Sequence, residues 1–428
     1  MKNLFLFISK FDLIPRSSVL IVAGILLLGC IGPNPQTTDS DAKPINASSV
    51  VNQSLQNISA NISSASNQTN HNTPTSVQQN KTDNSTTMQT PTNQTSDKTN
   101  ATFSQNQSLT KSTRLTIPQS IESNCVGFLV GDASEMKTIA LIGAAWVRPH
   151  PGPFAWGWIE KNKGTYDFTE TDQWVTEAQK NNISILATVW PFADWDQTCA
   201  QNCEVDQNDQ FYPRSKSGST NGIPAKRCKP CNTTAYAKFL TALVERYDGD
   251  GTEDMSGLVL PIRYYEIGNE PELNAPNLVF FKGTANDYVE ILTVSYNAIR
   301  AACNDCKIVQ GGAAGTDNNF LSFWESVYSL GGHQYYDIAN IHYIGHSDRN
   351  TLNVKAFRDS MNKYGVNKPV WVTEAQYKTK DPITDSFEGA LNAGASKVFF
   401  VSFKIGEMGP PVYGEYSQEY TTLPEKCR

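Results

Sequence analysis

From about residue 115 onward, short apolar runs of four to seven residues alternate with amphipathic stretches of ten to twenty residues. Runs of this length are typical of buried parallel strands, and the stretches between them have the spacing of helices that cover a sheet. We predict eight strands, at residues 126–130, 145–148, 183–190, 263–267, 307–311, 338–342, 370–373 and 397–403. The predicted helices include residues 172–181, 234–247, 287–302, 319–329 and 352–364, with Thr234 and Asn286 as N-caps.

Eight strands joined by helices predict an α/β fold, the closed (β/α)8 TIM barrel. The 314 residues from 115 to 428 suffice for a barrel of about 250 residues with long loops. Only 25 residues follow residue 403, and they contain no convincing eighth helix, so we expect the barrel to be incompletely covered there. A doubly wound open sheet is the main alternative.

The first 30 residues have the pattern of a signal peptide. Three basic residues precede the apolar run at residues 18–28, which is short for a membrane span. Leu27-Leu28-Gly29-Cys30 resembles the lipobox of prokaryotic lipoproteins, which implies lipidation of Cys30. An uncleaved N-terminal anchor is the alternative. Both interpretations attach the chain to the membrane by its N-terminal end, with the rest on the extracellular face.

Residues 31–113 are rich in Asn, Ser, Thr and Gln and poor in large apolar residues. Such a composition cannot bury enough surface to offset the entropy of ordering, so we predict a disordered stalk, or linker, ahead of a catalytic domain at residues 114–428. The stalk contains ten Asn-x-Ser/Thr triplets, which predict a glycoprotein if the chain is exported. They begin at Asn46, Asn52, Asn57, Asn61, Asn67, Asn80, Asn84, Asn93, Asn100 and Asn106.

The cysteines predict disulfides, because eight remain besides Cys30 in a chain with an export signal. Cys303 and Cys306 form a local pair, and Cys125 and Cys427 are left, by elimination, to tie the two ends of the domain together. The remaining four lie in one polar segment, where they either form disulfides or hold a structural zinc ion. These four are Cys199, Cys203, Cys228 and Cys231.

Two strands of the predicted barrel end on a glutamate. Glu270 follows the fourth strand in Gly268-Asn269-Glu270-Pro271, and Glu374 ends the seventh in Trp371-Val372-Thr373-Glu374. In a (β/α)8 barrel, residues at the carboxyl ends of the strands form the active site, and strands four and seven lie on opposite sides of the ring. Two facing carboxylates are the requirement of glycosidic bond cleavage. Alternation along the fourth strand places Glu266 on the same face as Glu270, where it could have a supporting role.

These two motifs resemble the strand-four and strand-seven motifs of clan A retaining glycoside hydrolases, and families 39 and 5 are most similar. The resemblance covers residues 125 to 403. It implies that Glu270 is the acid/base, that Glu374 is the nucleophile and that Asn269 contacts the 2-hydroxyl of the sugar. It also implies that Arg148, at the end of the second strand, hydrogen-bonds the nucleophile, and that His342, at the end of the sixth, lies near it.

The chain departs from this pattern at one tyrosine. Many members carry His-x-Tyr at the sixth strand, but this chain has His342-Tyr343-Ile344. The tyrosine that steadies the nucleophile is therefore displaced or supplied by Tyr377. Aromatic rings stack on sugars, and the tryptophans after the second and third strands are candidates for this role. Trp190 and Trp195 are the strongest of them, and His150 and Asp194 could add polar contacts.

We conclude from the sequence that the chain is an extracytoplasmic glycosidase that cleaves O-glycosidic bonds in a polysaccharide, oligosaccharide or glycoconjugate by the retaining mechanism. A catalytically inactive carbohydrate-binding barrel of the cell envelope is the alternative, and an envelope scaffold with the barrel as a spacer is a third class. We expect a monomer without a cofactor or a catalytic metal. The net charge of −7 and the lack of a long Lys/Arg run argue against a nucleic-acid partner.

Overall fold

The computed structural model describes residues 114–213, 222–345, 347–377, 383–405 and 414–427. The predicted signal peptide, the lipidation of Cys30, and the stalk with its ten triplets lie outside the described residues. None of the described helices is both long enough and apolar enough to cross a membrane.

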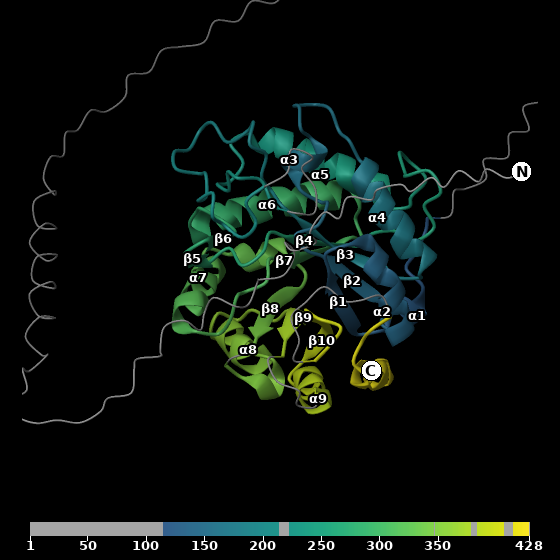
Figure 1. Ribbon diagram of the computed structural model, residues 1–428. Helices are drawn as coiled ribbons and strands as arrows, with labels where there is room; N and C mark the ends of the chain where they lie inside the picture. Colours follow the sequence, from purple (N-terminus) through teal and green to yellow (C-terminus); the bar gives the residue numbers. More distant parts are fainter. Residues whose placement is uncertain (1–113, 214–221, 346, 378–382, 406–413, 428) are drawn as a thin grey trace, which may run out of the picture. The chain divides into compact units, whose positions relative to one another are not determined.

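Eight parallel strands form the barrel, which confirms the predicted fold (Figure 1). Their order around the sheet is β7-β4-β3-β2-β1-β10-β9-β8, and single bridges from Val309 to Ile338 and from Ala313 to Ile341 connect the two edge strands. The barrel is thus nearly closed. Its strands are β1 (Val126–Val130), β2 (Trp146–Pro149), β3 (Ser184–Val189), β4 (Tyr264–Ile267), β7 (Lys307–Gln310), β8 (Ala339–Ile344), β9 (Val370–Gln376) and β10 (Ala395–Phe400). Nearly every strand residue is buried, as parallel sheets with both faces covered require.

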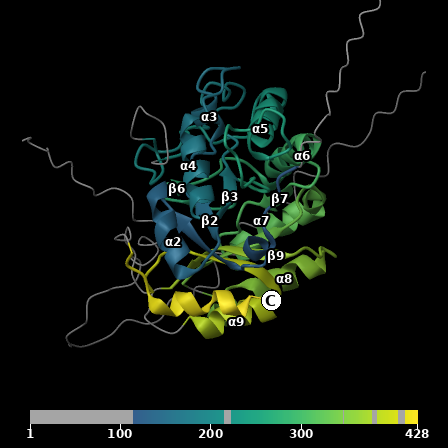
Figure 2. The same ribbon diagram turned by 90° about the vertical axis from the view of Figure 1, so that its right-hand side faces the viewer.

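The helices surround the strands, as the two views at right angles show (Figures 1 and 2). They are α1 (Gln119–Glu122), α2 (Met136–Ile142), α3 (Trp156–Ile159), α4 (Thr169–Lys180), α5 (Thr233–Tyr247), α6 (Ala285–Ala302), α7 (Asn318–Ser329), α8 (Val354–Lys363) and α9 (Thr384–Asn392). In α6, the buried residues Tyr288, Ile291, Leu292, Ser295 and Ile299 recur with helical spacing and face the barrel.

Both predicted N-caps are wrong by two residues. Helix α5 is capped by Asn232, whose side chain accepts a hydrogen bond from the amide of Ala235. Helix α6 begins after Thr284, which forms a reciprocal capping box with Asp287. In each case an earlier polar side chain reaches a free amide of the first turn, so the helix begins before the predicted cap.

The sequence patterns also did not indicate the hairpin of β5 (Asn274–Ala275) and β6 (Leu278–Val279), which lies between β4 and α6 and outside the barrel sheet. After β10, the described residues form only the short 3₁₀ turns η5 (Gln418–Thr422) and η6 (Pro424–Lys426). Within the described part of the chain, no α-helix therefore follows the eighth barrel strand, as expected.

All eight cysteines of the domain form disulfides, which confirms the general prediction. Cys125 pairs with Cys427, and Cys303 pairs with Cys306. The other two bonds, Cys199–Cys231 and Cys203–Cys228, join the ends of the long segment between β3 and α5. The zinc alternative is wrong, because each of the four sulfurs is bonded to another sulfur.

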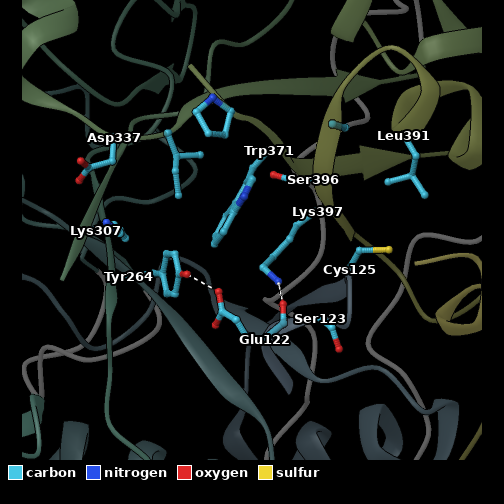
Figure 3. A pocket seen from close by; sticks show the side chains of 13 residues that line it. Glu122, Ser123, Cys125, Tyr264, Lys307, Asp337, Trp371, Leu391, Ser396 and Lys397 are labelled. Carbon is cyan, nitrogen blue, oxygen red and sulfur yellow. Dashed lines mark hydrogen bonds between the residues drawn. The ribbon is translucent and has the colours of Figure 1, made fainter. Parts of the chain in front are cut away.

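Aromatic side chains fill the barrel interior near the amino-terminal ends of the strands. Trp146, Tyr264 and Trp371 pack against one another with ring centroids 4.9–5.7 Å apart. Below them lies a cavity of about 600 Å³ at the amino-terminal end of the strands (Figure 3). Lys397 lines this cavity, and its Nζ donates hydrogen bonds to the carbonyls of Glu122 and Asn124 at 2.7 and 2.9 Å. These aromatic rings fill the barrel interior near the amino-terminal ends of the strands. The buried polar side chains of the site lie toward the carboxyl ends.

Candidate active site

Glu270 lies three residues past the end of β4, in a turn that the surrounding backbone holds in place. The amide of Gly268 donates to the carbonyl of Val189 at 2.9 Å, and the amide of Glu270 donates to the carbonyl of Gly312 at 3.0 Å. Glu270 has φ = 38°, in the left-handed region that residues other than glycine seldom occupy. Backbone strain of this kind collects at functional sites, where neighbouring contacts maintain it.

Glu374 lies inside β9, which continues three residues further than predicted. The register between β8 and β9 shifts by one residue, so that Ile341 is opposite Val372 but His342 is opposite Glu374. Thr373 is the additional residue, and such a bulge redirects the side chains that follow it. Both Thr373 and Glu374 consequently contact inward-facing groups.

The two glutamates approach each other across the mouth of the barrel. One carboxylate oxygen of each, together with a ring nitrogen of His342, forms a group whose members lie within 4.8 Å of one another. His342 Nδ1 is 2.7 Å from Glu270 Oε1 and 3.8 Å from Glu374 Oε1. Both carboxylates are almost fully buried, with exposed fractions of 6% for Glu270 and 2% for Glu374.

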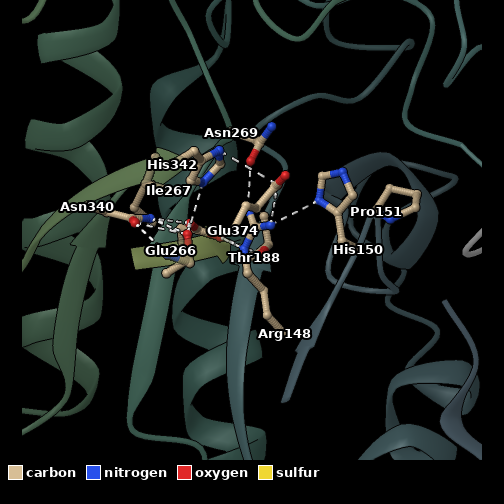
Figure 4. Close-up of polar contacts among 12 residues, drawn as sticks. Arg148, His150, Pro151, Thr188, Glu266, Ile267, Asn269, Asn340, His342 and Glu374 are labelled. Atoms are coloured by element: carbon tan, nitrogen blue, oxygen red, sulfur yellow. Dashed lines mark hydrogen bonds and ion pairs between the residues drawn. The ribbon is translucent and has the colours of Figure 1, made fainter. Parts of the chain in front are cut away.

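Arg148, which is fully buried on β2, connects these groups (Figure 4). Its Nη1 donates to Glu374 Oε1 at 2.8 Å, and its Nη2 donates to Asn269 Oδ1 at 2.5 Å. Its Nε donates to Glu266 Oε2 at 2.6 Å. The structure therefore brings together five predicted site residues, Glu270, Glu374, Asn269, Arg148 and His342, and adds Glu266 as a direct partner of the arginine.

Burial and nearby charges affect the pKa values of the two glutamates differently. Burial raises the pKa of Glu270 to about 8; Arg148 lowers it, and the charge of Glu266 raises it further. Burial also raises the pKa of Glu374, but His342 and the direct contact with Arg148 act in the opposite direction. Burial lowers the pKa of His342 to about 4, so the imidazole facing Glu270 is neutral near pH 7. Because Glu374 has the guanidinium contact, the proton of the pair belongs on Glu270.

His150 lies next to Arg148 at the border of the site. Its Nδ1 lies 3.4 Å from Arg148 Nη1, and its ring packs against Trp190, Phe211 and Phe280 with centroids 5.3–6.1 Å apart. Burial, with the charge of Arg148, lowers the pKa of His150 well below its ordinary value. Because Nδ1 faces a donor, the proton of the neutral ring belongs on Nε2. Aromatic side chains from the segment after β3 and from the residue after β6 thus form one wall of the site.

The remaining candidates lie further from the carboxylates. Trp190 is fully buried, stacks on Phe280 at 5.8 Å, and donates from Nε1 to the carbonyl of Pro151 at 2.6 Å. Trp195 is half-buried and donates to the carbonyl of Glu160 at 2.7 Å. Tyr377 packs near Phe400 and Tyr343. Among the described residues, no hydrogen bond joins Trp195 or Tyr377 to either glutamate, and the roles of these three residues stay predictions.

Several buried polar atoms around the site have no hydrogen-bond partner. They are Nδ2 of Asn269, Nε2 of His150, and both amide atoms of Gln376, two residues after Glu374. A buried polar atom without a partner costs about 1–3 kcal/mol. Atoms of this kind at a strand-end site are suited to binding a polar ligand that would satisfy them.

A metal ion fits this site poorly. The carboxylates of Glu270 and Glu374 and the ring of His342 are close enough to be ligands. However, the guanidinium of Arg148 already contacts Glu374, and its positive charge opposes a cation at the same oxygens. The arrangement is better suited to proton transfer and nucleophilic attack than to metal binding.

The sequence matches no protein-family model and no curated protein. Among solved structures, the chain is similar to a glucosidase from Croceicoccus marinus, with 15% identity, 62% of this chain and 55% of that chain covered, and a TM-score of 0.45. It is similar to a family 39 glycoside hydrolase from Bacteroides cellulosilyticus WH2, with 16% identity, 72% and 64% covered, and a TM-score of 0.46.

A third similar structure is the catalytic domain of GH30 xylanase C from Talaromyces cellulolyticus, with 15% identity, 74% of this chain and 78% of that chain covered, and a TM-score of 0.45. The chain spans 55% and 64% of the length of the first two proteins. Likenesses at this level do not identify an activity, so function has to be inferred from the site itself.

Proposed function

We propose that this protein is a retaining glycoside hydrolase that cleaves O-glycosidic bonds in a polysaccharide or glycoconjugate, with Glu270 as acid/base and Glu374 as nucleophile. One observation carries the proposal: the two carboxylates have oxygens within 4.8 Å of each other at the carboxyl ends of β4 and β9. Retaining glycosidases have carboxyl groups about 5–5.5 Å apart, whereas inverting enzymes leave about 6.5–9.5 Å for a water molecule.

The proposed reaction has two steps. In the first, a carboxylate oxygen of Glu374 bonds to the anomeric carbon while the glycosidic bond breaks and Glu270 gives its proton to the leaving oxygen. In the second, ionised Glu270 takes a proton from water, the water oxygen bonds to the anomeric carbon, and Glu374 leaves as a carboxylate. Arg148 supports both steps, because its contact with Glu374 stabilises the ionised form.

The unsatisfied atoms around the carboxylates support a saccharide as the ligand. Sugar hydroxyls both donate and accept hydrogen bonds, so they are suited to the unpartnered donor Nδ2 of Asn269 and to the unpartnered amide of Gln376. The rings of Trp190, Phe211 and Phe280 next to His150 give the same site an apolar wall. A polar cradle with an aromatic side is typical of small-molecule sites that bind sugars.

We also propose that the barrel is displayed on the extracellular face of the membrane through a lipid on Cys30. The lipobox-like Leu27-Leu28-Gly29-Cys30 sequence and the four disulfides of the barrel support an exported chain. Replacing Cys30 by Ser should move the protein from the detergent-extracted membrane fraction to the aqueous fraction. Retention of the variant in the membrane would favour an uncleaved anchor.

The test of activity is a screen of aryl glycosides and polysaccharides, followed by trapping with a 2-fluoro glycoside of the sugar that reacts. We expect one covalent adduct, located by peptide mass spectrometry on Glu374. An adduct on another residue would overturn the assignment of the nucleophile.

The rival function is a catalytically inactive carbohydrate-binding barrel. It is favoured by Tyr377, whose hydroxyl forms no hydrogen bond with Glu374 among the described residues. The Glu374→Ala variant distinguishes the two functions. If the wild type binds a polysaccharide without cleaving it and the variant binds equally well, the barrel is a binding module.

A further inference from the structure

Glu266 is a third carboxylate beneath the proposed catalytic pair, and it is fully buried. It lies in the middle of β4, on the inward face and four residues before Glu270. A buried carboxylate is costly unless it is paired and hydrogen-bonded, so a carboxylate kept at this position requires an explanation.

Four side chains from four other strands contact Glu266. On Oε2 it accepts hydrogen bonds from Arg148 Nε of β2 and from Thr188 Oγ1 of β3, each at 2.6 Å. On Oε1 it accepts from Asn340 Nδ2 of β8 at 2.6 Å and from Thr373 Oγ1 of β9 at 3.2 Å. All four donors are themselves fully buried. Both oxygens are therefore saturated, and no lone pair is left for a substrate.

One consequence concerns the direction of Arg148. Its Nε is occupied by Glu266, and the guanidinium is planar and rigid, so the Nη1 and Nη2 donors can point only toward Glu374 and Asn269. The single positive charge is also shared between two carboxylates, Glu266 and Glu374. Glu266 thus determines both the position of the arginine and the share of its charge that reaches the proposed nucleophile.

A second consequence concerns Glu270. Thr373 Oγ1 contacts Glu266 and also lies 3.0 Å from His342 Nε2, while His342 Nδ1 lies 2.7 Å from Glu270. Glu266 is therefore connected to the acid/base through two side chains, without touching it. The path through Arg148 leads to the nucleophile, and the path through Thr373 and His342 leads to the acid/base.

We propose that Glu266 is a positioning residue that divides the charge of Arg148 with Glu374 and ensures that the proton of the catalytic pair resides on Glu270. This inference rests on the proposed function. Glu266 touches no reacting atom, and its effect is exerted through Arg148, Thr373 and His342.

The direction of the effect follows from the charges around the site. The groups that face the two catalytic carboxylates are Arg148 and His150 from β2 and the residue after it, Glu266 from β4, Glu272 after Glu270, and His342 from β8. The charge of Glu266 contributes to the raised pKa of Glu270. Replacing it with a neutral amide leaves the whole charge of Arg148 to the catalytic pair, so the pKa of Glu270 falls.

The first experiment compares wild type with Glu266→Gln in the pH dependence of kcat/KM on a glycoside whose leaving group must be protonated by the acid. We expect the alkaline limb to move to lower pH by about one pKa unit in the variant, so that its kcat/KM relative to wild type is about fivefold lower at pH 8 than at pH 5. An unchanged pH profile would overturn the proposal. Glu160→Gln is the matched control, because it neutralises a buried carboxylate that contacts Trp156 and Gly164 outside the site. It should lower the thermal stability without moving the limb.

The second experiment does not require activity. Protein labelled with ¹³C in the glutamate carboxyl groups is titrated by NMR, and the Glu270 resonance is identified as the one missing from Glu270→Gln. Its midpoint should be lower in Glu266→Gln than in the wild type. A lower midpoint in a protein that cleaves no glycoside would sink the proposed function but retain the role of Glu266. An unchanged midpoint in an active enzyme would overturn the role of Glu266 but leave the proposed function intact.

Glu266→Asp keeps the experiment decisive if Glu266→Gln does not fold. The shorter side chain preserves the charge but lengthens the contact with Arg148. We expect kcat to fall more than KM rises, because a displaced guanidinium loses its direct contact with the nucleophile and affects substrate binding only through Asn269. Full kcat in this variant would show that Arg148 is positioned without Glu266.

Discussion

At the scale of single residues, the site is governed by how two carboxylates share one proton. Glu270 faces a neutral histidine and Glu374 faces a guanidinium, although both are almost fully buried. Two chemically identical side chains thus have different environments, and this difference supports the proposed roles of Glu270 as the acid and Glu374 as the nucleophile.

We predict that Glu270→Gln loses about 10²- to 10⁴-fold in kcat on glycosides with poor leaving groups, the usual contribution of general acid catalysis. The loss should be much smaller for aryl glycosides whose leaving group needs no proton. Because burial raises the pKa of Glu270 to about 8, the wild type should lose kcat/KM as pH rises through that value. Steady-state kinetics from pH 5 to 9 on both substrate classes is the measurement, and equal losses on the two would exclude Glu270 as the acid.

At the scale of the elements, the segment between β3 and α5 forms a wall of the site and is closed by two disulfides. Phe211, which packs on His150, lies between Cys203 and Cys228. The buried Arg227 holds the same segment through Asp209 at 3.0 Å and the carbonyl of Phe211 at 3.0 Å. The disulfides and this arginine together hold the aromatic wall against the carboxylates.

We expect the double variant Cys203→Ser/Cys228→Ser to raise KM more than it lowers kcat, because we propose that the wall contacts the substrate and takes no part in proton transfer. Loss of a disulfide loop of this size also costs about 2–4 kcal/mol of stability. Kinetics and urea unfolding would check both parts. The matched control is Cys303→Ser/Cys306→Ser, which removes a bond within a short turn after α6 and should leave KM unchanged.

Helix α1 is held to the base of the barrel by Lys397 of β10 (Figure 3). Burial lowers the pKa of Lys397 from 10.5 to about 8, although Glu122 opposes this shift. Below pH 8 both the folded and the unfolded chain carry the proton, and the burial cost of the charge is fully present. Between about pH 8 and 10.5 the unfolded chain binds more protons, so this lysine makes stability rise with pH.

Lys397→Met should remove that contribution. The free energy of unfolding of the wild type, relative to that of the variant, should increase as pH rises from 8 to 10.5. Urea unfolding at both pH values measures it. A difference that is constant with pH would show that Lys397 does not titrate in this window.

At the scale of the whole domain, the Cys125–Cys427 disulfide joins the start of the first barrel strand to the last described residue of the chain. It closes a loop with a sequence separation of 302 residues, so it restricts the unfolded chain far more than the other three bonds. The barrel has no α-helix after β10 among its described residues, and this bond fastens the segment that takes its place.

We predict that Cys125→Ser/Cys427→Ser lowers the free energy of unfolding by about 2–5 kcal/mol while kcat changes less than twofold, because the bond lies at the amino-terminal end of the strands. Thermal unfolding and kinetics on the same samples would check this. A large loss of kcat at a temperature where the variant is fully folded would contradict it.

The sequence alone determined the fold and the strand-end positions of the site residues. Alternating apolar runs and amphipathic stretches predicted eight strands within a few residues of their observed bounds, because short-range periodicity encodes which faces of an element are buried. The same counting placed Glu270 after the fourth strand and Glu374 on the seventh. The presence of disulfides was also predicted, from the even number of cysteines and the signal-peptide-like pattern of the first 30 residues.

Only the tertiary structure decided which inward-facing groups meet. Glu266 is contacted from four other strands by Arg148, Thr188, Asn340 and Thr373, which lie 118, 78, 74 and 107 residues away in the chain. The bulge at Thr373, the pairing of Cys199 with Cys231, and the burial of Trp190 belong to the same class. Periodicity states that a side chain faces inward, but its height in the barrel and its partners depend on how the strands are staggered when the sheet closes.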